Sequence, residues 1–90
     1  MNNIDETKPR EIINDDEAKK LENAGFERDN EYVFNIFCRP TIKYELIYLQ
    51  KSKKKGFYEL GWNDEYNNYD YRYFKNIDKA IKLALYLNQL

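Results

Sequence analysis

The stretch FYELGWNDEYNNYDYRYF, residues 57–74, decides the fold. Two runs rich in aromatic residues, FYELGW and YDYRYF, flank the polar segment NDEYNN. In YDYRYF a tyrosine stands at every second position, and a period of two is typical of a β-strand. Asparagine and aspartate are common in turns because their side chains hydrogen-bond to the nearby backbone. We therefore predict two antiparallel strands joined by a polar loop.

The preceding segment predicts two more strands. EYVFNIFCR (31–39) and TIKYELIYLQK (41–51) combine alternation with β-branched and aromatic residues, which favours strand over helix. Pro40 lies between them, where a strand ends. The loop KSKKKG (51–56) ends at Gly56, which supplies the backbone freedom that a hairpin turn needs. Connections this short predict an antiparallel meander of three to four strands.

Capping signals predict one helix on each side of the strands. Asn14, with Glu17 three residues later, predicts the start of a short helix over about 15–24, and Gly25 predicts its end. Asn76 predicts the start of a longer C-terminal helix. The order α-β-β-β-β-α is an α+β fold in which the C-terminal helix covers one face of the sheet.

The apolar positions predict a core and a self-association. We expect Leu46, Ile81 and Leu85 to be buried, because they lie on the apolar faces of a strand and of the C-terminal helix. The apolar arc of that helix spans roughly 200°, which is wider than one sheet face covers. We therefore expect a homodimer, in which a two-fold axis brings the same patch of two copies together.

Length and composition limit the class of protein. The 90 residues, 42% of them hydrophobic, predict one domain over 13–90 after a flexible polar arm over 1–12. The single cysteine and the lack of a long apolar run predict a soluble protein of the bacterial cytoplasm. Abundant Lys, Asn, Tyr and Ile, which have AT-rich codons, favour a phage or mobile element of a low-GC bacterium.

Catalytic and metal-binding residues are scarce in this sequence. It contains no histidine, the side chain that most often serves as a general base or metal ligand near neutral pH. Cys38 follows Phe34 and Ile36 at strand spacing, which is typical of a small buried hydrophobic residue. We expect a non-enzymatic protein that uses no cofactor and no metal.

The aromatic residues around the NDEYNN loop predict a binding surface. Tyrosine and tryptophan offer large, rigid contact area with a polar tip, and they are enriched at protein interfaces. The alternative is that these rings form the core through cross-strand pairs. If Phe74 faces the core, the alternating tyrosines face away from it. The expected partner is a host protein, and the expected partner-binding residues are Trp62, Asp64, Glu65, Tyr66, Tyr69 and Tyr71.

The lysine loop indicates an alternative function, contact with nucleic acid. Lysine side chains bind phosphates as point charges. The same lysines are also typical of a solvated hairpin tip whose charges discourage aggregation of neighbouring strands. The candidate contacts are Lys51, Lys53, Lys54 and Lys55.

Two resemblances bear on these alternatives. The order of elements, with Lys75, Lys79 and Lys82 near the start of the last helix, resembles the double-stranded-RNA-binding domain, a family that contacts phosphates there. The sequence lacks that family's glycine-containing lysine signature, adds a strand and places Asp78 among the lysines. GWNDEY (61–66) resembles a short stretch of a phage anti-CRISPR protein that blocks the DNA-binding site of Cas9 as a nucleic-acid mimic. The second resemblance implies an inhibitor of host defence and carries over no functional residue.

Overall fold

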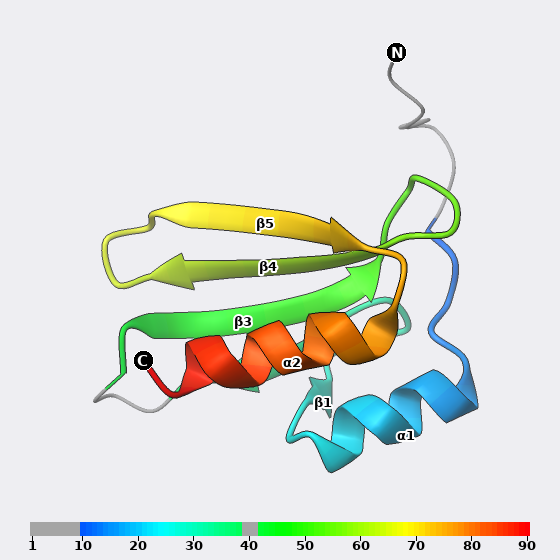
Figure 1. The fold of residues 1–90 in the computed structure, drawn as a ribbon, viewed down its shortest axis with the longest axis horizontal. Helices are drawn as coiled ribbons and strands as arrows, with labels where there is room; N and C mark the ends of the chain where they lie inside the picture. The colour runs from blue at the N-terminus through cyan, green and yellow to red at the C-terminus, as the bar shows by residue number, and fades with distance from the viewer. Residues whose placement is uncertain (1–9, 39–41) are drawn as a thin grey trace.

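The predicted α+β meander is present in the computed structural model, which describes residues 10–38 and 42–90. The sheet is antiparallel and its strands follow one another in sequence order, β1-β2-β3-β4-β5 (Figure 1). The elements are α1 (Asp15–Asn23), β1 (Glu27–Arg28), β2 (Phe34–Phe37), β3 (Tyr44–Lys51), β4 (Tyr58–Asp64), β5 (Tyr69–Phe74) and α2 (Ile77–Asn88). The predicted arm over 1–12 lies outside the described residues except for its last three positions.

The sheet has one strand more than the sequence predicts. The two residues of β1, Glu27 and Arg28, pair with Asn35 and Phe34 of β2. Two consecutive exposed, charged residues carry no alternating pattern, so local sequence does not reveal this strand.

Both helices begin at the predicted caps. The Asn14 side chain accepts a hydrogen bond from Glu17 N (2.8 Å), and Asn14 N donates to Glu17 Oε1 (2.9 Å), which completes a capping box. The Asn76 side chain accepts from Asp78 N (2.8 Å) at the start of α2. Gly25, with φ of 98°, ends the first helical segment in the left-handed conformation that glycine adopts readily.

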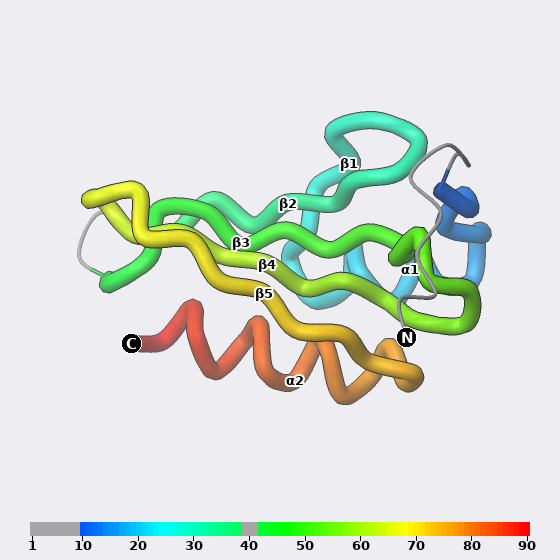
Figure 2. Tube along the Cα trace, turned by 90° about the horizontal axis from the view of Figure 1, so that it is seen from above, coloured from blue at the N-terminus to red at the C-terminus, as the bar shows by residue number. Residues whose placement is uncertain are grey.

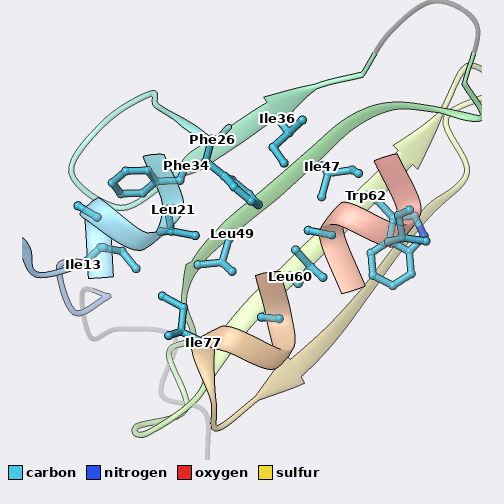
Figure 3. Close-up of a cluster of buried hydrophobic side chains, with 14 residues drawn as sticks. Ile13, Leu21, Phe26, Phe34, Ile36, Ile47, Leu49, Leu60, Trp62 and Ile77 are labelled. Carbon is cyan, nitrogen blue, oxygen red and sulfur yellow. The ribbon is translucent and has the colours of Figure 1, made fainter. Parts of the chain in front are cut away.

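Both helices pack on the same face of the sheet. Their apolar side chains join those of β2, β3 and β4 in one cluster, and Figure 3 shows these side chains gathered between the helices and the strands. The opposite face of β3, β4 and β5 is covered by no helix of the described chain, as Figure 2 shows from above. The core residues are Ile13, Ala18, Leu21, Phe26, Phe34, Ile36, Ile47, Leu49, Leu60, Trp62, Ile77, Ala80, Ala84 and Leu87.

The predicted core residues are corrected by this packing. Leu46 lies on the uncovered face and is half-buried, whereas its neighbours Ile47 and Leu49 are fully buried. Ile81 is half-buried against the core, and Leu85 is 37% exposed. Ala80 and Ala84, the two α2 positions at 0% exposure, carry small side chains that let the helix approach the sheet closely.

A β-bulge places Tyr44 and Leu46 on opposite faces of the sheet. Tyr44 pairs with Asp64 and Leu46 pairs with Asn63, so Glu45 is an extra residue in β3. The bulge places the Tyr44 ring against Trp62, on the core side, with a centroid distance of 6.5 Å. The uninterrupted alternation of the sequence assigned Tyr44 and Leu46 to the same face, and the extra residue separates them.

No helix within the described ranges is long and apolar enough to cross a membrane.

Candidate binding surface

A row of aromatic rings crosses the uncovered face of the sheet. Tyr69, Tyr71 and Tyr73 project from β5, Tyr48 joins them from β3, and Phe57 joins from the residue before β4. We call these five residues the tyrosine face. The centroid distances of successive rings, from Tyr48 through Tyr69, Tyr71 and Tyr73 to Phe57, are 6.2, 5.9, 5.4 and 6.5 Å. Each ring therefore lies within the distance at which aromatic pairs stabilise one another.

Gly61 fixes the position of the Tyr48 ring. A Cβ atom at Gly61 would lie 2.1 Å from Cε2 and 2.3 Å from Cζ of Tyr48, so the ring lies directly over the glycine backbone. Glycine inside a strand often marks a close approach of this kind. Neither Gly61 nor Tyr48 is among the predicted binding residues, although an isolated glycine between Leu60 and Trp62 is a sequence signal for a close approach.

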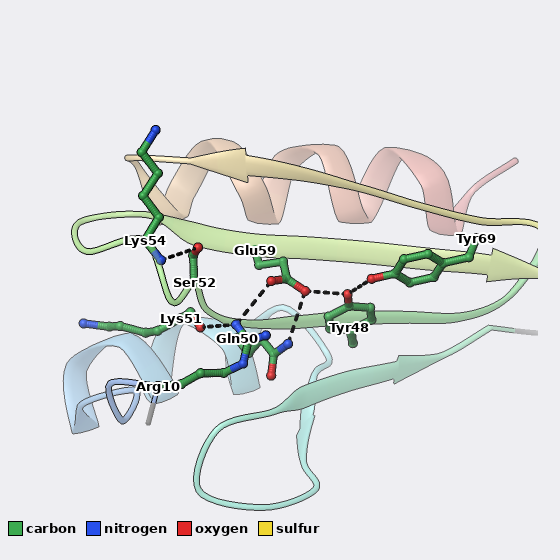
Figure 4. A network of polar contacts seen from close by, with 8 residues as sticks. All are labelled: Arg10, Tyr48, Gln50, Lys51, Ser52, Lys54, Glu59 and Tyr69. Carbon is green, nitrogen blue, oxygen red and sulfur yellow. Dashed lines mark hydrogen bonds and ion pairs between the residues drawn. The ribbon is translucent and has the colours of Figure 1, made fainter. Parts of the chain in front are cut away.

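A polar network ties the Tyr48 hydroxyl in place (Figure 4). This hydroxyl donates to Glu59 Oε2 (2.7 Å) and also contacts the Tyr69 hydroxyl. Gln50 Nε2 donates to the same Glu59 oxygen (3.2 Å), while Arg10 Nη1 forms an ion pair with Glu59 Oε1 (3.2 Å). Burial, followed by the hydrogen bond to Glu59, raises the pKa of Tyr48 far above its ordinary value, so its hydroxyl stays protonated as a donor.

The network also pairs the charge of Glu59, a buried acid beneath the tyrosines. Glu59 is a buried side chain whose charge is paired with Arg10, which donates in addition to the Lys51 carbonyl oxygen (3.0 Å). Burial and the nearby Glu59 also raise the pKa of Tyr73. This face therefore exposes neutral, oriented tyrosines rather than an open carboxylate.

The structure divides the residues that were predicted to bind a partner. Tyr66, Tyr69 and Tyr71 are 77%, 56% and 46% exposed. Glu65 is exposed in the β4–β5 turn beside them. Trp62 is 8% exposed and faces the helices, because it follows Leu60 at strand spacing, so its predicted place on the partner-facing surface is wrong.

Asp64 organises the turn between β4 and β5. Its Oδ1 accepts hydrogen bonds from Tyr66 N and Asn68 N (both 2.9 Å), and its Oδ2 accepts from Asn68 Nδ2 (2.9 Å). These bonds favour the carboxylate, and the one from the Asn68 side chain contributes most to lowering the pKa of Asp64 below 3.8. The turn that presents Tyr66 thus depends on an ionised Asp64.

The first prediction concerns the titration of Asp64. We expect NMR titration to give a pKa below 3.8 for Asp64, and Asn68→Ala to raise it toward 3.8. Because the pKa of Asp64 is lower in the folded state, its carboxylate stabilises the turn fully at pH values above the unfolded-state pKa. This contribution is lost as the pH falls through the folded-state pKa. An Asn68→Ala variant with an unchanged Asp64 titration would contradict this assignment.

The lysines of the 51–56 loop also differ in their surroundings. Lys51 Nζ lies 3.4 Å from Glu17 Oε1 and 5.5 Å from the centroid of the Tyr58 ring, so it serves to attach α1 to the sheet. Lys54 and Lys75 lie over the Phe57 ring at 4.6 and 5.4 Å from its centroid. Lys53 is half-buried and Lys55 is exposed.

Comparisons with known proteins return no matching family model, no matching curated protein and no matching solved structure. In the part of the chain that the structure describes, no three acidic, cysteine or histidine side chains form a group able to hold a metal ion. Cys38 is half-buried against the core, and burial raises the pKa of its thiol.

Proposed function

We propose that this protein is a non-enzymatic binding module that contacts a partner protein with its tyrosine face. The observation that carries the proposal is the continuous row of rings on a sheet face that no described helix covers. One covered face is sufficient to form the core of a domain of this size. The aromatic side chains on the other face contribute little to that core, and contiguous exposed aromatic surface is typical of interaction sites.

The chemistry of the face favours a protein as the partner. Tyrosine side chains combine apolar contact area with a hydroxyl that tolerates water, and they lose little conformational entropy on binding. The Tyr48 ring is already held by Gly61 below it and by Glu59 at its hydroxyl. A preorganised surface of this kind loses less entropy when a partner docks on it.

The acidic turn forms the rim of the proposed surface. Glu65 is exposed, and Asp64 holds the turn through its hydrogen bonds. Rim charges affect the rate of association and its dependence on salt more than they affect affinity. We assign this role to Glu65.

The setting that size and composition favour is a phage or mobile element of a low-GC bacterium. In that setting the partner would be a host protein, and the module would inhibit or redirect it. This part of the proposal rests on size and composition.

The second prediction is an alanine scan of the surface tyrosines. Capture from host lysate first identifies the partner, and affinities are then measured for Tyr66→Ala, Tyr69→Ala and Tyr71→Ala. We expect at least one variant to lose about thirtyfold in affinity, roughly 2 kcal/mol. Tyr66→Ala should change stability by no more than about 0.5 kcal/mol, because this side chain is 77% exposed.

The matched control for the scan is Tyr86→Ala. Tyr86 is an exposed tyrosine, 58% accessible, on α2, which packs against the other face of the sheet. This variant should bind the partner with wild-type affinity. Wild-type affinity of both Tyr69→Ala and Tyr71→Ala, equal to that of the control, would exclude the tyrosine face as the binding site.

The position of the lysines supports a second candidate, binding of single-stranded nucleic acid. Lys54 and Lys75 lie over Phe57 at one end of the tyrosine face, so cations stand beside rings on which bases are able to stack. Binding of this kind weakens steeply as salt rises, because phosphate contacts release counterions. An oligonucleotide gel shift that disappears in a Lys53→Ser/Lys54→Ser/Lys55→Ser variant would favour it over a protein partner.

A further inference from the structure

The strand β5 forms an open edge of the sheet. Figure 1 shows β5 at the upper edge, with no described helix or strand beyond it. Its six residues contain no proline, and five of them are exposed. The other edge is β1, which is only two residues long. Long open edges attract further strands unless they are blocked, so the free side of β5 is the place where this sheet is able to grow.

The outward-facing backbone groups of β5 belong to its tyrosines. Asp64 N donates to Asn68 O (3.1 Å) at the start of the β4–β5 ladder. Hydrogen-bonded pairs alternate along an antiparallel ladder, so Trp62↔Asp70 and Leu60↔Arg72 are the next such pairs. The N–H and C=O groups of Tyr69, Tyr71 and Tyr73 therefore point away from β4, toward the open edge.

The sequence of the edge is complementary to itself. In the segment YDYRY, residues 69–73, Asp70 and Arg72 stand symmetrically around Tyr71. If a second β5 pairs antiparallel with Tyr71 opposite Tyr71, Asp70 of each copy faces Arg72 of the other. The outward N–H and C=O groups of all three tyrosines then find partners in the same register.

We propose that two copies of this chain associate through their β5 edges, antiparallel and centred on Tyr71, to form one continuous sheet. Opposite charges directly across a strand pair stabilise the pair. The two tyrosine faces lie on the same side of this sheet and join across the two-fold axis. The proposal rests on the edge itself and not on the function assigned to the tyrosine face.

In the single chain, Asp70 and Arg72 are placed so that both can take new partners when the dimer forms. Asp70 Oδ1 accepts a hydrogen bond from Tyr71 N (2.8 Å), so the central edge donor is satisfied from within the chain. The Arg72 guanidinium is exposed and has no ion pair or hydrogen bond to residues 10–38 or 42–90. In the dimer, the Tyr71 carbonyl of the second copy takes over the Tyr71 N–H, and the freed Asp70 carboxylate pairs with the second copy's Arg72.

The two-fold axis also brings oppositely charged loops together. The β4–β5 turn and the lysine loop lie at opposite ends of the β4–β5 pair, as Figure 1 shows. In the antiparallel dimer, the turn of one copy lies at the end that carries the lysine loop of the other. Glu65 and Lys55, both exposed, are of opposite sign there. This arrangement brings loops of opposite charge to the same end of the dimer.

The test is a charge exchange at Asp70 and Arg72, read by sedimentation velocity. Wild-type protein should be dimeric at high micromolar concentration and should dissociate as salt is added. Asp70→Arg and Arg72→Asp each place like charges across both pairs, so each variant alone should have a dissociation constant raised at least about tenfold. Mixed in equal amounts, the two variants restore opposite charges at both pairs and should form a heterodimer of near wild-type affinity.

The double variant Asp70→Arg/Arg72→Asp should dimerise like the wild type, since each pair is only reversed. Both positions are exposed, and circular dichroism checks that every variant is folded. A monomeric wild-type protein would overturn the proposal. So would a dimer that both single variants leave intact, which is the result expected if the exposed side of α2 forms the contact instead.

Discussion

Leu49→Ala is expected to lower the free energy of unfolding by about 2–5 kcal/mol, a large part of the total stability of a small domain. Leu49 is completely buried between the sheet and the helices, next to Phe34 on β2 and Leu60 on β4, its pairing partners. Alanine would leave a cavity that these neighbours fill only in part. Chemical denaturation of the two proteins, analysed with a common slope, measures the difference.

Leu46→Ala is the matched control for this prediction. Leu46 stands three residues earlier in the same strand, carries the same side chain and lies on the uncovered face. We expect its loss to cost only about 1 kcal/mol, because the half-buried side chain leaves no closed cavity. A larger cost at Leu46 than at Leu49 would mean that the register of β3 is displaced by one residue.

Gly61→Ala is expected to destabilise the protein by about 1–3 kcal/mol, because the new methyl group occupies the volume of the Tyr48 ring. The ring would have to leave its place over β4, which breaks its hydrogen bond to the buried Glu59. Loss of a partner from a buried charged group adds to the cost. The variant should also lower affinity for the partner, since Tyr48 belongs to the tyrosine face.

A double-mutant cycle isolates the steric cause. In a Tyr48→Ala background the space above Gly61 is free, so Gly61→Ala should cost less than about 0.5 kcal/mol. The backbone of Gly61 does not demand glycine, because it is not among the glycines with positive φ. Equal costs of Gly61→Ala in both backgrounds would show that the close approach of the Tyr48 ring has no energetic consequence.

Local chemistry made most of the fold predictable. The capping box of α1 and the N-cap of α2 act within a few positions, so Asn14 and Asn76 reveal the helix starts directly. The alternation in YDYRYF likewise fixed which residues of β5 share a face, and Phe74 packs against the core as that alternation requires. These signals need no knowledge of the partner strands.

Features that depend on strand pairing were not predictable. The bulge at Glu45 exists only relative to β4, because nothing in TIKYELIYLQK interrupts the alternation. Both alternating sets of β3 are apolar, with Leu46 and Tyr48 on one face and Ile47 and Leu49 on the other, so alternation alone does not select the core face and Leu46 was misassigned. The two-residue strand β1 is defined by its contact with β2 alone.

Among the residues of the candidate site, those set by local sequence were predictable and those that depend on strand pairing were not. Tyr66, Tyr69 and Tyr71 were found as exposed aromatics because they lie in or next to one strand whose alternation is regular. Trp62 was misplaced because the residue type that is enriched at interfaces also fills cores. The place of Tyr48 in the tyrosine face was not predictable, because its side chain extends from β3 across β4, over Gly61, to reach Tyr69 on β5.

The most direct test of the central claim is a comparison of three baits in nuclease-treated host lysate. The baits are the wild-type protein, the face variant Tyr69→Ser/Tyr71→Ser and the control variant Tyr86→Ser, each verified to be folded. We predict that mass spectrometry identifies the same protein with the wild type and the control, and that this protein is lost from the face variant. Equal capture by all three baits, or capture only before nuclease treatment, would contradict a protein-binding tyrosine face.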